Sequence, residues 1–201
     1  MRKLHLLLPL AVLALAFGLV ACGGGESDED KIVETIETSA TSADPADCKE
    51  LATQAFLEQT ELEEGDAAVK SCEESAKDTS DDPDSVEVSK VEVDGSSATA
   101  NVAFTGGNFD KQVLGVALVE EDDQWKMDEV TEFVKLDQEQ LASSFEESFQ
   151  SSEDAIDPEL ASCIGEVLRD LDQSQVEEVV IGGTSEPIVE IVEGCSEGLQ
   201  Q

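Results

Sequence analysis

The sequence has no tyrosine, one tryptophan and a single histidine, His5, which lies in an apolar segment near the start of the chain. After His5 there is no histidine left to activate a serine or cysteine nucleophile, so Ser-His-Asp and Cys-His catalytic systems are excluded from the rest of the chain. Zinc sites are disfavoured as well, because no C-x-x-C spacing occurs. No glycine-rich phosphate loop links a strand pattern to a helix pattern. The sequence therefore offers no catalytic motif, and we expect no cofactor and no metal site.

Basic residues are scarce: 11 Lys and Arg face 48 Asp and Glu, which gives a formal net charge of −37. This excludes nucleic acid as a partner, because phosphate binding needs a basic surface. One interpretation of the acidity is that an acidic surface keeps the protein solvated, while a high salt concentration screens the repulsion between its charges. The other is loose calcium binding by the acidic runs at 81–84 and 120–123, although neither matches an EF-hand loop. The even spread of acids along the chain favours solvation.

Long apolar runs are limited to one, Leu4 to Val20, which follows the basic residues Arg2 and Lys3. A basic segment followed by an apolar segment is typical of a signal peptide. The run ends in Leu-Val-Ala-Cys at 19–22, which resembles a bacterial lipobox. That resemblance implies lipidation of Cys22 by a diacylglyceryl group. A signal anchor, or ordinary cleavage beside a stray thiol, is the alternative.

On the lipobox reading, residues 1–21 are a signal peptide that is removed, and residues 22–30 are a flexible tether rich in glycine. The mature protein is then extracytoplasmic, held by its lipid at the outer face of the cytoplasmic membrane. Its acidic body is repelled by anionic lipid, so the membrane partner is reached through Cys22 alone.

Four further cysteines remain, and four cysteines allow three pairings. Their distribution favours two local disulfides, Cys48–Cys72 and Cys163–Cys195, one in each half of the chain. Export to an oxidising compartment makes such bridges stable. On the chain-entropy model each adds roughly 3–4 kcal/mol.

The first half of the mature chain starts with helical patterns. Apolar residues recur at intervals of three and four over 28–41, from Asp47 through Phe56, and over 65–77, which predicts three helices. Cys48 and Cys72 lie on the apolar faces of the second and third, which supports their pairing.

The periodicity then changes to two. Val86, Val88, Val91 and Val93 nearly alternate, with a slip near Ser89 that indicates a bulge. Asp94-Gly95 is a hairpin signal. Clean alternation over 98–104, an apolar run over 113–119 and a last run from Trp125 to Phe133 complete four antiparallel strands. We expect the 113–119 strand to be covered on both faces.

Helices followed by a curved antiparallel sheet that ends in Gln-Trp-Lys-Met-Asp-Glu-Val at 124–130 resemble the secreted NTF2-like (cystatin-like α+β cone) domains of actinobacterial lipoproteins. The resemblance covers residues 28 to 135, and we assign the domain to 31–135. It implies helices that close a cone-shaped pocket over the sheet. Enzymes of that superfamily use Tyr, His and Asp, so the resemblance carries no catalytic residue to this chain. Candidate pocket residues are Phe56, Phe104, Trp125 and Met127. Thr99 and Asn101 have the opposite parity to Phe104 along their strand, which weakens them as candidates for the lining.

Residues 136–201 form a separate helical pattern, which resembles the small all-α C-terminal modules of secreted actinobacterial proteins. Asp137 with Gln140 predicts a capping box, and Asp157-Pro158 a helix start. Two more helix starts are predicted, one at Ser174 with Glu177 and one at Ser185 with Pro187. Cys163 and Cys195 lie on apolar stripes of the first and last of the three short helices.

The fold class expected is therefore α+β, with N-terminal helices packed on a curved four-stranded antiparallel sheet, followed by a small all-α module. The function expected is non-catalytic binding of a small apolar ligand in the pocket by a membrane-anchored lipoprotein. The alternative is a structural or protein-interaction lipoprotein whose core is filled and holds no ligand, and whose partner is a cell-envelope protein. An acid–base enzyme that relies on Asp and Glu alone is the third candidate.

Overall fold

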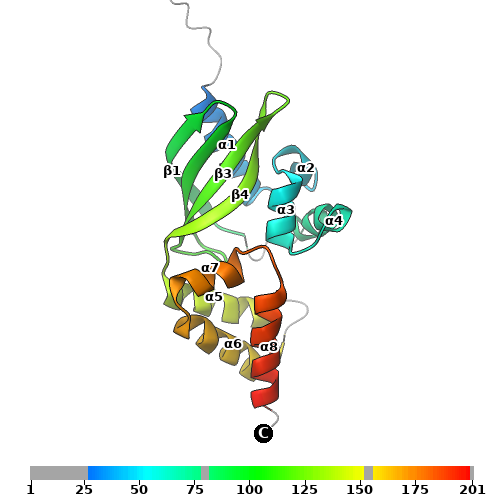
Figure 1. Ribbon diagram of the computed structural model, residues 1–201, viewed down its shortest axis with the longest axis vertical. Coiled ribbons are helices and arrows are strands. Elements are labelled where there is room, and N and C mark those ends of the chain that lie inside the picture. Colours follow the sequence, from blue (N-terminus) through cyan, green and yellow to red (C-terminus); the bar gives the residue numbers. More distant parts are fainter. Residues whose placement is uncertain (1–26, 78–81, 152–155, 200–201) are drawn as a thin grey trace, which may run out of the picture.

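The computed structural model describes residues 27–77, 82–151 and 156–199. The expected signal peptide, residues 1–21, and the lipidation residue Cys22 lie outside these ranges. The described chain is a mixed α+β fold in which helices precede and follow one four-stranded antiparallel sheet (Figure 1). Within the described ranges, no helix has both the length and the apolar character needed to cross a membrane.

The elements follow one another in a simple order. Four helices come first: α1 (Asp28–Thr41), α2 (Asp47–Glu50), α3 (Gln54–Glu61) and α4 (Asp66–Ser75). The strands are β1 (Ser85–Asp94), β2 (Ser97–Thr105), β3 (Val113–Glu121) and β4 (Gln124–Lys135). Four helices follow: α5 (Gln138–Ser151), α6 (Pro158–Asp170), α7 (Gln173–Val180) and α8 (Glu186–Gly198).

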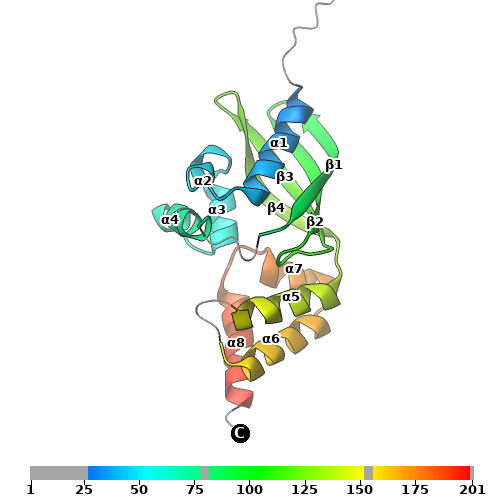
Figure 2. The same cartoon turned by 180° about the vertical axis from the view of Figure 1, so that it is seen from behind.

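Helix α1 packs against the inner face of the sheet (Figure 2). It starts with a capping box, in which the Ser27 hydroxyl accepts from the Asp30 N–H and the Asp30 carboxylate accepts from the Ser27 N–H. The helix expected over 28–41 is therefore confirmed, and residues 28–30, which the sequence also assigns to the tether, belong to it. Ile32 and Ile36 are fully buried on the face turned to the sheet.

The helix expected from Asp47 through Phe56 is divided in two. Residues 51–53 pair with the edge of β4: Met127 N–H donates to the Leu51 carbonyl and Thr53 N–H to the Met127 carbonyl, both at 2.8 Å. The Thr53 hydroxyl then caps α3 by accepting from the Phe56 N–H. Backbone bonds to the sheet and a new N-cap thus outweigh the continuous helical pattern, because helix propensity is a weak prior.

The sheet is a meander in the order β1-β2-β3-β4. The register shifts between Ser89 and Glu92, which confirms the expected bulge, and Gly95 occupies the hairpin turn with φ +64°. The expectation that β3 is covered on both faces is wrong, since no described helix crosses the outer face (Figure 1). Val113, Ala117 and Val119 point to that face and are half-buried by neighbouring strands rather than by a second layer.

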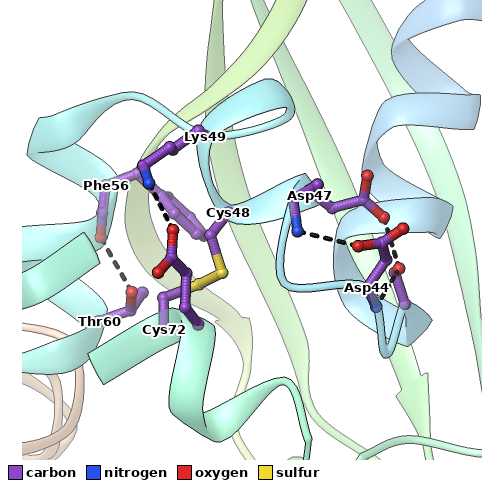
Figure 3. The surroundings of a disulfide bond; sticks show 10 residues. Asp44, Asp47, Cys48, Lys49, Phe56, Thr60 and Cys72 are labelled. Atoms are coloured by element: carbon purple, nitrogen blue, oxygen red, sulfur yellow. Dashed lines mark hydrogen bonds and ion pairs between the residues drawn. A yellow bond between two sulfur atoms is a disulfide. The ribbon is translucent and has the colours of Figure 1, made fainter. Parts of the chain in front are cut away.

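Both expected disulfides are present. Cys48–Cys72 joins α2 to α4 with Cα atoms 6.1 Å apart, and Cys163–Cys195 joins α6 to α8 at 5.8 Å. An ion pair between Lys49 and Glu73 runs beside the first bridge (Figure 3).

Helix starts in the C-terminal module follow the sequence only partly. Asp157 caps α6 with Pro158 in its first turn, as expected. Helix α7 is capped by Asp172 in a capping box with Gln175, two residues before the expected Ser174, because Asp172 reaches the Gln175 N–H. Ser185 precedes α8 without a side-chain cap bond.

The Asp137–Gln140 capping box is half formed. The Asp137 carboxylate accepts from the Gln140 N–H at 3.2 Å, but the Gln140 side chain is bonded to Lys111 and Ser144. The Asp137 N–H instead donates to the Gln112 side chain at 2.7 Å. A residue of the sheet region thus replaces the helix residue that a capping box requires.

Three apolar clusters connect the parts. One lies between the sheet and α1–α4, one between the lower end of the sheet and helices α5 and α7, and one among α5, α6 and α8. The middle cluster includes Leu114 and Phe133 from the sheet with Leu141, Val176 and Ile181 from the module. The helical module is therefore packed onto the sheet through a shared core.

Candidate functional site

An apolar hollow of about 240 Å³ lies between the inner face of the sheet and helices α1, α3 and α7, and we call it the sheet hollow. It is partly open to solvent. Helix α1 contributes Ile36 and Ala40, and the sheet contributes Val102, Val116 and others. Two of the α1 residues in the lining, Ser39 and Ala40, have small side chains.

Three of the four residues expected to line a pocket do so. Phe56, Phe104 and Met127 come from α3, β2 and β4 and lie in the lining of the sheet hollow. Trp125 lies elsewhere: it is 2% exposed in the core, and its indole N–H has no hydrogen-bond partner in the described structure. Alternation along β4 predicts an inward ring for Trp125, but does not predict how far along the strand the hollow extends.

Helix α7 closes the sheet hollow with Val180 and Ile181, and the sequence did not predict this. The contact is fixed by Gln59 on α3. Its Nε2 donates to the Ile181 carbonyl at 2.7 Å and to the Val130 carbonyl at 2.8 Å, and its Oε1 accepts from the Val130 N–H at 2.8 Å. One side chain thus holds a helix, a strand and the module together.

The turn after α7 makes this contact close. Gly183 has φ +70°, a conformation that favours glycine, and a Cβ there would lie 3.3 Å from the Gln59 Cα. Any larger residue would therefore push the turn away from α3. A glycine pair in a turn was visible in the sequence, but its packing partner, more than a hundred residues earlier, was not.

A second hollow of about 260 Å³ continues into the helical module, and we call it the module hollow. Its walls come from the module helices, with Ile164 and Leu168 from α6 and Ile188 and Ile191 from α8. The two linings share three residues, Thr60, Phe109 and Val180.

Phe109 stands between the two hollows, in the loop joining β2 to β3. Its ring centroid lies 5.7 Å from that of Phe104, which lines the sheet hollow, and 6.5 Å from that of Phe145, which lines the module hollow. The two hollows are thus adjacent, with Phe109 and Val180 in the lining of both, and we call the pair of hollows the groove.

The Phe109 loop is held by a fully buried glutamine. Gln112 is 0% exposed, and its Nε2 donates to the carbonyls of Asp110 and Asp137 at 3.1 and 3.0 Å. Its backbone N–H donates to the Phe109 carbonyl. Buried polar groups of this kind are satisfied at nearly every position in native proteins, and here the satisfied groups include the start of α5. Nothing in the sequence pattern predicts this role for Gln112.

The groove is chemically uniform. Among the described residues that line either hollow, none is charged or titratable, and the polar ones are Ser39, Gln59, Thr60 and Asn108. Gln59 is fully engaged as described, and the Thr60 hydroxyl donates to the Phe56 carbonyl at 3.0 Å. Across the described residues, no group of three or more His, Cys, Asp or Glu is placed to hold a metal ion.

Comparison with known proteins finds no family model, no curated protein and no solved structure that matches this chain.

Proposed function

We propose that the protein is a non-catalytic, lipid-anchored extracytoplasmic lipoprotein that binds a small apolar ligand in the sheet hollow. The observation that carries the proposal is the sheet hollow itself: an apolar space of about 240 Å³, partly open, beneath α1 and α3. Natural ligand sites are apolar concavities of roughly 300–1,000 Å³ with few polar groups. The sheet hollow, at about 240 Å³, lies just below that range, and the adjoining module hollow adds about 260 Å³.

A non-catalytic role is supported by the lining. General acid–base chemistry needs a titratable side chain within hydrogen-bond reach of the substrate. Both linings consist of apolar, hydroxyl and amide side chains. An enzyme in this groove would have to rely on Ser39 or Thr60 without a neighbouring base among the lining residues.

An NTF2-like cone is the finer form of this proposal. The order of helices and the four-stranded meander agree with it, and the hollow lies between the helices and the inner face of the sheet as that superfamily would place it. In this protein the module helix α7 also closes the hollow, so the ligand site is formed by both parts of the chain.

Dye binding tests the ligand site. The uncharged dye N-phenylnaphthylamine should fluoresce when it enters the sheet hollow of the wild-type protein. Ala40→Trp places a large ring in the lining and should reduce dye binding by at least about tenfold, since overfilled sites exclude a ligand. Thr41→Trp is the matched control, because Thr41 is exposed at the same end of α1.

Equal dye binding by Ala40→Trp and wild type would refute the sheet hollow as the ligand site. Absence of dye binding by wild type would favour the alternative, a structural or interaction lipoprotein with no ligand. Circular dichroism of all three proteins shows that each is folded.

The anchor is tested separately. Cys22→Ser removes the thiol that a diacylglyceryl group would occupy, so the variant should leave the membrane fraction or retain residues 1–21. Fractionation of cells with mass spectrometry of the N-terminus measures both outcomes. A variant that stays in the membrane fraction with its N-terminus processed as in the wild type would disprove lipidation at Cys22.

A further inference from the structure

The charge distribution of the molecule limits the chemistry of its ligand. The chain carries a formal net charge of −37, yet the described residues that line the two hollows include none that is charged. An anionic headgroup in this groove would find no basic partner there. Burying an unpaired carboxylate costs far more than burying a neutral hydroxyl, and the surrounding acids would add repulsion.

Lys111 and Arg169, which lie close in sequence to the lining residues Phe109 and Leu168, are already engaged by other side chains. Lys111, two positions after Phe109, forms an ion pair with Asp110 and donates to the Gln140 side chain. Arg169 on α6 pairs with Glu139 and Glu146 on α5, at 3.1 and 2.8 Å. The two carboxylates and the Ser143 hydroxyl hold the guanidinium on the surface between these helices, so it is not free for a ligand carboxylate.

The shape of the groove limits the ligand further. The sheet hollow and the module hollow meet at Thr60, Phe109 and Val180, so a ligand that fills both must pass these three side chains. A compact ring system fills one hollow, whereas a flexible chain spans two. Phe109 is half-buried and lies on a loop rather than in a strand, and a ligand that fills both hollows has to displace its ring.

We propose that the ligand is an uncharged molecule with a long hydrocarbon chain, which runs from the sheet hollow past Phe109 into the module hollow. This inference rests on the proposed function and names the ligand class of the same site. The hydroxyl of Ser39 and the amide of Asn108 lie in the linings of the sheet hollow and the module hollow, where they suit a neutral hydroxyl or ester headgroup rather than an ion.

A matched pair of probes tests the charge. Oleyl alcohol and oleate have the same chain and differ at the headgroup, so displacement of N-phenylnaphthylamine at pH 8 compares the headgroups directly. We expect oleyl alcohol to bind at least about tenfold more tightly than oleate, because only oleate must bury a charge. Raising the salt concentration should reduce this ratio by screening the acidic surface.

Chain length and two variants test the extent of the site. Oleyl alcohol should bind more tightly than octanol, which is too short to fill both hollows. Ile188→Trp fills the module hollow from α8 and should remove most of that advantage while octanol binding persists. Val189→Trp is the control, because Val189 is 48% exposed on the same helix and outside the lining.

Each outcome decides between the two claims. If oleate binds as tightly as oleyl alcohol, the inference is wrong while the proposed function stands. If Ile188→Trp still binds octanol and leaves oleyl alcohol unaffected, the chain does not enter the module hollow and the inference is equally wrong. If neither the dye nor any probe binds wild type, the proposed function fails and the inference fails with it. Should Ile188→Trp lose octanol binding or its fold, Ile191→Trp on the same wall replaces it.

Discussion

The two halves of the protein have one disulfide each, but they depend on it differently. The sheet half buries a cluster of twelve residues on a hydrogen-bonded meander, and the Cys48–Cys72 bridge lies at the margin of that cluster, between two short helices. The module cluster buries four residues, and one of them is Cys195. A small core needs covalent support more than a large one. We therefore expect the stability of the module to depend on its disulfide more than the stability of the sheet half does.

The largest expected effect comes from removing the bridges one at a time. The double variant Cys163→Ala/Cys195→Ala should destabilise the module by about 3 kcal/mol or more, and dye binding should fall with it, since α7 and α8 line the groove. Cys48→Ala/Cys72→Ala should leave the module intact. Urea unfolding with hydrogen exchange of each half measures the contrast, and equal loss of protection in the module by both variants would contradict it.

The contact between the sheet half and the module, at Gln112, should be nearly as sensitive to substitution. Gln112→Leu keeps the volume of the side chain but removes its bonds, which leaves the backbone of Asp137 and Asp110 without side-chain partners. Unsatisfied buried polar groups cost about 1–3 kcal/mol each, so a loss of about 3 kcal/mol is expected. Gln140→Leu is the control, because Gln140 is only half-buried and bonds to exposed or half-buried side chains.

Urea unfolding followed separately in the sheet half and in the module shows where the loss falls. Gln112→Leu should uncouple the two transitions, because its bonds join the end of the sheet to α5. A single transition at the wild-type midpoint would show that the apolar cluster of Leu114, Phe133, Leu141, Val176 and Ile181 holds the joint by itself.

The sequence predicted the individual elements better than their junctions. Periodicity located the four strands, the bulge near Ser89 and both disulfides, because these depend on local pattern and on burial. It did not predict the break at residues 51–53, which depends on a backbone pairing with Met127. The bridging roles of Gln59 and Gln112 could not be predicted for the same reason. A glutamine is common on a helix or loop, and the carbonyl groups that these two bind lie far away in sequence.

The candidate site divides in the same way. Phe56, Phe104 and Met127 were named from strand and helix parity, and the structure places all three in one lining. The contributions of Val180, Ile181 and Phe109 depend on how the module packs on the sheet. No pattern within a single segment carries that information, so the expectation of a pocket confined to residues 31–135 left out its α7 wall.

A loss of stability of intermediate size is expected on substitution of Arg169 in the module. Its guanidinium joins α6 to Glu139 and Glu146 of α5. The hydrogen bond that Arg169 donates to the Glu146 carboxylate is the main reason that the pKa of Arg169 is raised. Arg169→Met keeps the packing of the stem and should cost about 1.5–2 kcal/mol, because charged hydrogen bonds are lost and Glu146 is left 20% exposed without its partner.

The corresponding ion pair in the sheet half, Lys49–Glu73, is more exposed. Lys49→Met should therefore cost under about 1 kcal/mol, as exposed pairs do. Urea midpoints of the two variants measure the difference, and an equal cost would show that the module does not depend on its polar contacts more than the sheet half does.

The smallest effect, at Asp172, has a defined pH dependence. Hydrogen bonds from the Ser174 hydroxyl and the Gln175 N–H lower the pKa of this carboxylate below its ordinary value. A lowered folded-state pKa adds stability that is complete above the unfolded pKa, near 3.8, and is lost as pH falls through the folded value. Asp172→Ala removes this N-cap and should lower the free energy of unfolding at pH 7, and the loss should shrink as the pH falls through the folded-state pKa. Hydrogen bonds from Ser27 lower the pKa of the Asp30 carboxylate on α1 in the same way. Asp30→Ala should therefore show the same pH profile in the sheet half.

The two variants should differ in which half they affect. Because the sheet half has the larger core, Asp30→Ala should leave hydrogen exchange of the module unchanged, whereas Asp172→Ala should raise hydrogen exchange around α7 and weaken dye binding. Loss of module protection in Asp30→Ala would mean that the two halves unfold as one unit and that their different reliance on disulfides has no thermodynamic consequence.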